Sequence, residues 1–95
     1  MKLVQNQRGF LAGKFTDSYG NSCSIQKSSL ATDDCIWLGI DKPGLTVFEN
    51  KDMGFYIKTE LPENWVVDSR MHLSREQVAE LLPALLRFVE TGELQ

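Results

Sequence analysis

The chain has 95 residues, of which 42% are hydrophobic and 24% are charged, and its formal net charge is −3. This length predicts one domain with a single small core. The acidic balance and the scattered basic residues argue against nucleic acid and anionic membranes as partners, because both require a basic surface. No apolar stretch reaches membrane-spanning length and no secretion signal opens the chain, so we expect a cytoplasmic protein.

The first half of the chain predicts three strands. Residues 9–16 and 22–28 alternate between apolar and polar side chains, which is typical of half-buried strands, and residues 35–40 are apolar on both sides. Between the first two strands, Gly20 supplies the positive φ that a tight turn needs. The second and third strands form a hairpin around a polar connection.

The second half predicts a further hairpin and a last strand. Residues 45–48 and 55–59 flank a loop at 49–54, after a type II turn at 42–45. Residues 65–71 alternate again and are expected to form the final strand.

A helix from residue 75 to about residue 91 completes the chain. Ser74 and Gln77 form a capping box at its start, and Gly92 is well placed just beyond its end. At helical spacing, one broad stripe collects the apolar side chains of Val78, Leu81, Leu82, Leu85, Leu86, Phe88 and Val89.

These elements predict an α+β fold of residues 1–95 as a single domain. We expect a twisted antiparallel sheet of about five or six short strands, with the C-terminal helix packed on one face. In the hairpin register, Ile25 faces Leu38 and Cys23 faces Ile40 on the face toward the helix. Trp37 then lies on the other, open face of the sheet, where it pairs with Gln26 and is near Ser24.

Trp37 is therefore the first candidate for a functional residue. A tryptophan among small polar side chains on an open sheet face suits stacking or an anchor at an interface. The competing interpretation is that a loop such as 49–54 covers Trp37, since large aromatic side chains are usually buried.

The remaining candidates are polar. Ser28 and Ser29, beside Lys27, could bind an anionic group, although serine at such a position more often stabilises a turn. His72 shares a predicted strand face with Asp68 and Arg70, so a carboxylate could orient the imidazole. The competing role of His72 is to close the corner between strand and helix. The binding candidates are thus Ser24, Gln26, Ser28, Ser29, Trp37, Arg70 and His72.

Catalysis and metal binding have little support. No nucleophile motif accompanies His72, so we expect no catalytic residues and no enzyme activity. Two cysteines and one histidine fall short of the four ligands of a structural zinc site. We therefore expect neither a metal nor a cofactor, and Cys23 and Cys35 should be free thiols.

Several strings of residues in the chain are distinctive, namely Phe15-Thr16-Asp17, Cys23-Ser24-Ile25-Gln26, Ile36-Trp37-Leu38-Gly39, Met71-His72-Leu73-Ser74, Leu81-Leu82-Pro83 and Thr91-Gly92-Glu93-Leu94. Together they resemble a family of small uncharacterised bacterial proteins that are often associated with phages and prophages. The resemblance covers most of the chain outside residues 41–59. It implies a phage or bacterial setting and no particular mechanism.

Taken together, these features predict a non-catalytic accessory protein that binds a protein partner, or a second copy of itself, through the open sheet face. The alternative is a protein that binds or sequesters a small anionic or nucleotide-like molecule. In that case Trp37 would stack on the ligand, and Lys27, Ser28, Ser29 or Arg70 would contact its anionic groups.

Overall fold

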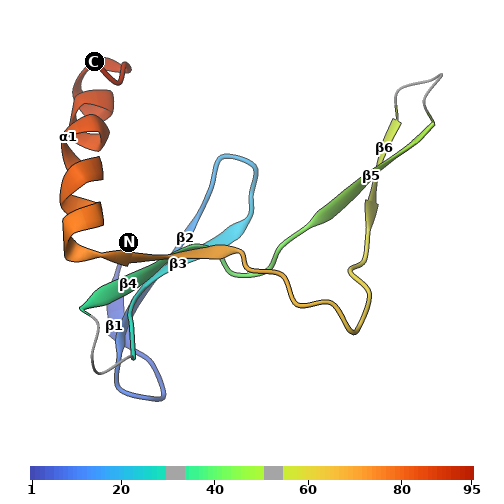
Figure 1. Cartoon of the computed structure of the whole chain (residues 1–95), viewed down its shortest axis with the longest axis horizontal. Coiled ribbons are helices and arrows are strands. Elements are labelled where there is room, and N and C mark those ends of the chain that lie inside the picture. Colours follow the sequence, from blue (N-terminus) through green and yellow to red (C-terminus); the bar gives the residue numbers. More distant parts are fainter. Residues whose placement is uncertain (30–33, 51–54) are drawn as a thin grey trace.

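The computed structural model describes residues 1–29, 34–50 and 55–95, and within these ranges seven strands precede one helix (Figure 1). In chain order they are β1 (Leu3–Gln5), β2 (Leu11–Thr16), β3 (Ser22–Lys27), β4 (Cys35–Ile40), β5 (Leu45–Asn50), β6 (Phe55–Thr59), β7 (Arg70–Ser74) and α1 (Arg75–Thr91).

Five of the strands form one open antiparallel sheet in the order β1-β2-β3-β4-β7. The predicted α+β fold is confirmed. Strands β5 and β6 pair only with each other, in a separate two-stranded ribbon that projects away from the sheet (Figure 1). The β5 strand runs to Asn50, two residues into the predicted loop, and residues 51–54 of that loop lie outside the described residues.

The predicted register of the β3–β4 hairpin is confirmed, because Cys23 pairs with Ile40, Ile25 with Leu38 and Gln26 with Trp37. Alternation along paired strands therefore divides the sheet into two faces. The apolar face carries Leu3, Leu11, Phe15, Cys23, Ile25, Ile36, Leu38, Ile40, Met71 and Leu73. The polar face carries Lys14, Ser24, Gln26, Ser28, Trp37, Arg70 and His72.

The caps of α1 are confirmed in detail. Ser74 Oγ accepts from the backbone N–H of Gln77 at 3.2 Å, while Gln77 Oε1 accepts from the N–H of Ser74 at 2.9 Å. Gly92 ends the helix in the left-handed region at φ 79°, where glycine carries no steric penalty.

The packing of α1 differs from the prediction. The helix was expected to lie across the apolar face, but it rises away from the sheet and none of its residues is buried (Figure 1). The cause is the junction, because β7 ends at Ser74 and α1 begins at Arg75. No loop is present to reverse the chain direction and return the helix over the sheet.

The last strand also differs from the prediction, since β7 covers Arg70–Ser74 rather than 65–71. Pairing between β4 and β7 begins with Gly39 opposite Arg70, and residues 65–69 are not in a strand. At Gly39 (φ 148°), a Cβ would lie 2.7 Å from the carbonyl oxygen of Ser69, so only glycine allows β7 to approach there. The predicted type II turn at 42–45 is wrong as well, because Gly44 does not have a positive φ.

Strand β1 was not predicted. The turn that connects β1 to β2 contains Asn6, whose Oδ1 accepts from the N–H groups of Arg8 and Phe10 at 2.9 and 3.0 Å. Gly9 follows with φ 85°. Asparagine followed by glycine three residues later is a turn signal that would have located this hairpin.

Candidate functional site

The candidate site lies on the polar face, where Gln26, Trp37 and His72 occupy one row across β3, β4 and β7. The alternation that directs Ile25 and Leu38 toward the apolar face directs Gln26 and Trp37 to the other side. All three residues are partly exposed to solvent.

Trp37 is half-buried between two side chains of β7. The centroid of its ring is 4.2 Å from that of His72, with an angle of 36° between the rings, and the guanidinium carbon of Arg70 lies 5.4 Å from the Trp37 centroid. Such aromatic and cation–π contacts each contribute about 0.5–1.5 kcal/mol. We call Trp37, Arg70 and His72 the Trp37 cluster.

His72 also connects β7 to the end of β3, because its Nε2 lies 2.9 Å from the Oγ of Ser28. The predicted orientation of His72 by Asp68 is not what the structure shows, since Asp68 precedes β7 and is exposed. A serine hydroxyl beside an imidazole is the first requirement of nucleophilic catalysis. Ser28, however, is only 4% exposed, so most of the residue is withdrawn from solvent.

Asp41 lies beside the candidate site and was not among the residues predicted from the sequence. Its carboxylate accepts from Ser24 Oγ at 2.5 Å and from Lys14 Nζ at 2.9 Å. Burial raises the pKa of the Asp41 carboxyl, but the hydrogen bonds from Ser24 and Lys14 and the charges of Lys14 and Arg70 outweigh it and hold this pKa below its usual range. Asp41 continues the alternation of Trp37 and Gly39, and this signal would have placed it on the polar face.

A small hollow of about 290 Å³ adjoins the Trp37 cluster. Besides Trp37 and Arg70, it is lined by Asp41 and by the segment Val67, Asp68 and Ser69, which leads into β7. Its charged side chains are therefore two carboxylates and one guanidinium. The guanidinium of Arg70 already lies against the Trp37 ring.

Six of the seven predicted site residues come together on the polar face, and the register explains why. Ser24 and Ser28 are buried, whereas Gln26, Trp37, Arg70 and His72 are half-buried. Ser29 is exposed beyond the end of β3 and outside the cluster. The adjoining residues 30–33, the predicted hairpin connection, lie outside the described residues.

Other features of the described residues concern metals, membranes and thiols. In the parts of the chain that the structure describes, no group of three or more histidine, cysteine or carboxylate side chains could hold a metal ion. No helix there has the length and apolar character needed to span a membrane. Cys23 and Cys35 are free thiols on opposite faces of the sheet.

Comparison of the chain with protein-family models, curated proteins and solved structures finds no match. The function proposed below therefore depends on the residues and the geometry described above.

Proposed function

We propose that this chain is a cytoplasmic, non-catalytic accessory protein of a phage or prophage type, which binds a protein partner through the polar face of its sheet. The observation that carries the proposal is the Trp37 cluster. It presents an aromatic ring, an imidazole and a guanidinium side by side on an open sheet face. Aromatic and arginine side chains of this kind supply most of the binding energy at protein interfaces.

The charges of the site favour a protein over a small anionic ligand. The cations near the hollow are already engaged, because Lys14 pairs with Asp41 and the Arg70 guanidinium lies against Trp37. An anionic ligand such as a nucleotide would find no unpaired cation among the lining residues and would lie beside the exposed carboxylate of Asp68. A protein segment can instead place polar or basic groups beside the carboxylates and stack on Trp37.

The low solvent exposure of Ser28 favours a binding role over a catalytic one. Its contact with His72 joins β3 to β7 and orients the imidazole against Trp37. In this interpretation the Ser28–His72 contact supports the binding surface.

The experiment is a pull-down from bacterial lysate with mass spectrometry, which compares the wild type with Trp37→Ala. The matched control is Trp65→Ala, because Trp65 is exposed and outside both sheets. A protein retained by the wild type and by Trp65→Ala should bind Trp37→Ala at least about 2 kcal/mol more weakly in calorimetry.

The unfolding midpoint of each variant is measured in parallel, so that loss of the fold is not mistaken for loss of binding. Equal binding by the wild type and a folded Trp37→Ala variant would contradict the proposal. Retention of a small molecule instead of a protein, detected by native mass spectrometry, would favour the ligand-binding alternative.

A further inference from the structure

The single chain leaves an unusually large surface in contact with solvent. Its accessible surface is 8347 Å², whereas a compact monomer of 10.8 kDa is expected to expose about 5500 Å². Its radius of gyration is 17.0 Å, against about 12 Å for a compact domain of this length. Of the residues whose burial the structure describes, only Gly13, Cys23, Ser24 and Ser28 are buried. One chain therefore does not form a core of its own.

Much of the exposed surface belongs to the apolar stripe of α1. Its side chains retain between 45% and 80% of their accessible surface, namely Leu81, Leu82, Leu85, Leu86, Phe88 and Val89. An exposed apolar surface of this extent marks an interaction site. Pro83 lies within the helix and does not end it.

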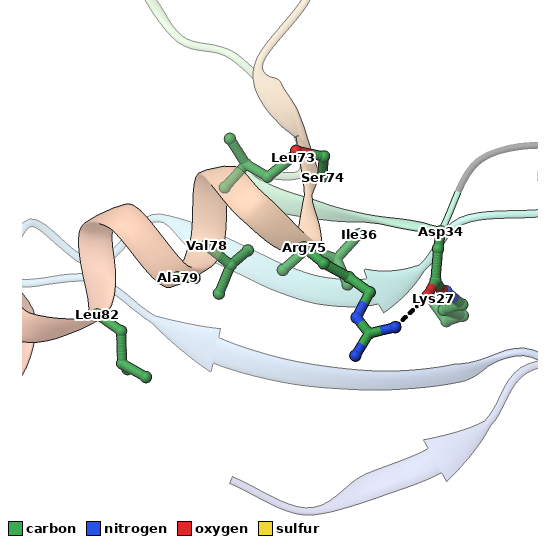
Figure 2. Close-up of a pocket in the computed structure, with 9 residues that line it drawn as sticks. All are labelled: Lys27, Asp34, Ile36, Leu73, Ser74, Arg75, Val78, Ala79 and Leu82. Carbon is green, nitrogen blue, oxygen red and sulfur yellow. Dashed lines mark hydrogen bonds and ion pairs between the residues drawn. The ribbon is translucent and has the colours of Figure 1, made fainter.

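The apolar face of the sheet is the second uncovered surface. Leu3, Leu11 and Met71 are each at least half exposed, and Phe15 is exposed as well. The only side chains of α1 near this face are those of its first two turns. Val78 and Leu82 flank an open groove of about 330 Å³ opposite Ile36 and Leu73 (Figure 2).

One end of this groove is polar, whereas its walls are apolar. Asp34 forms ion pairs with Lys27 and with Arg75, the latter at 3.3 Å (Figure 2). These ion pairs lie at the junction of sheet and helix. Farther along α1, the groove opens onto the uncovered apolar face.

The two uncovered surfaces match in size. A helix of 17 residues is about 26 Å long, and a sheet of five strands is about 19 Å across. One α1 helix is therefore long enough to cross every strand of one sheet. The direct junction at Ser74 prevents a helix from covering its own sheet in this way.

We propose that a second copy of this chain covers the apolar face by laying its α1 across the sheet, and that the two copies exchange helices about a two-fold axis. Because each chain carries both surfaces, one exchange covers both apolar faces and both helix stripes. A foreign partner that covered one surface would leave the other exposed. The excess surface of about 2800 Å² per chain amounts to about 5600 Å² for two chains, part of it on the separate β5–β6 ribbon. It is large enough for the interface of an obligate dimer, which buries about 2000–5000 Å² in total.

This dimer uses the face opposite the Trp37 cluster, so it is independent of the proposed binding function. Sedimentation equilibrium should give twice the 10.8 kDa mass of the chain. A monomer at concentrations of tens of micromolar would overturn the proposal.

The arrangement is tested on the wild-type protein, with no substitution that could unfold it. A sample is mixed from isotope-labelled and unlabelled chains, and NMR contacts between methyl groups of different chains are recorded. Contacts between Leu82 or Leu85 of one chain and Ile25 or Leu38 of the other are expected. A dimer in which these contacts arise only within one chain, or in which the copies pair only through β7 edges, would overturn the exchange.

Two helix variants test the same surface. Leu85→Gln should raise the dissociation constant of the dimer by about 100-fold, because each dimer loses two buried leucines. Glu80→Gln is the matched control on the charged side of the same helix and should leave the constant unchanged within a factor of two. Equal constants for the two variants would overturn the role of the apolar stripe.

Discussion

At the residue scale, Asp41 has an effect on the polar face beyond that of an ordinary surface carboxylate. It follows β4 and accepts hydrogen bonds from Lys14 on β2 and Ser24 on β3. One side chain thus joins three neighbouring strands near the hollow beside Trp37. Both donors favour the ionised carboxylate, so protonation of Asp41 weakens these contacts.

Asp41 should make the stability of the protein sensitive to acid. Its pKa in the folded protein lies below the unfolded value of about 3.9, so its stabilising effect is complete above that value and is lost as the pH falls through the folded pKa. The thermal midpoint of Asp41→Asn should lie below that of the wild type at pH 7, and the gap should narrow below about pH 4. Scans from pH 2 to pH 7 measure this gap, with Glu63→Gln as an exposed control. A constant gap would contradict the prediction.

The two thiols should react at different rates in the folded protein. Cys23 is buried on the apolar face at 3% exposure, whereas Cys35 is half-buried on the polar face. Labelling with a maleimide under native conditions should modify Cys35 first, and peptide mapping identifies the site. Both thiols should react in denaturant. Faster labelling of Cys23 would mean that the two faces are assigned the wrong way round.

At the element scale, the sequence was informative where local chemistry decides the structure. The alternation in residues 22–28 and the apolar run 35–40 predicted the pairing of β3 with β4, and with it the position of Trp37. Ser74, Gln77 and Gly92 predicted both ends of α1. The predicted boundaries of β7 were less accurate. Residues 65–69 alternate like a strand, but the pairing of β7 with β4 begins only at Arg70, opposite Gly39.

The orientation of α1 could not be predicted from its periodicity. An apolar stripe shows that a surface must be covered, but it does not show which chain covers it. The same limit applies to the site. Alternation placed Ser24, Gln26 and Trp37 on one face, whereas the position of Arg70 and His72 beside them depends on the pairing of β7 with β4.

The capping box of α1 gives the clearest prediction at this scale. Ser74→Ala should destabilise the folded protein by about 1 kcal/mol, because the N–H of Gln77 loses its acceptor. Ser74→Asn keeps a capping oxygen and should recover most of the loss. Chemical denaturation measures both variants, and binding to a partner of the polar face should not change separately. Equal losses for alanine and asparagine would exclude the cap as the cause.

At the scale of the whole molecule, folding and association should be a single event. In the proposed dimer, a chain with so few buried residues gains most of its apolar burial from the second copy. Leu85 then stabilises the protein through the partner's sheet rather than its own. The stability of such a protein depends on its concentration.

The thermal midpoint should therefore rise with protein concentration. Mass action predicts an increase of several degrees over a 100-fold range for an obligate dimer, and calorimetry or circular dichroism at three concentrations measures it. Glu80→Gln should show the same slope. A midpoint independent of concentration would indicate that the single chain folds alone.

Strand β7 serves two surfaces at once, and this makes its length more constrained than that of other segments. Arg70 and His72 face the Trp37 side, while Met71 and Leu73 face the side on which the second copy is proposed to lie. Inserting one residue between Arg70 and Met71 would either turn Arg70 to the other face or exchange the faces of Met71, His72 and Leu73 and displace the start of α1. One inserted residue in the exposed segment 63–66 would leave both surfaces in place. Genetic tolerance to insertions should therefore be high in that segment and low within β7.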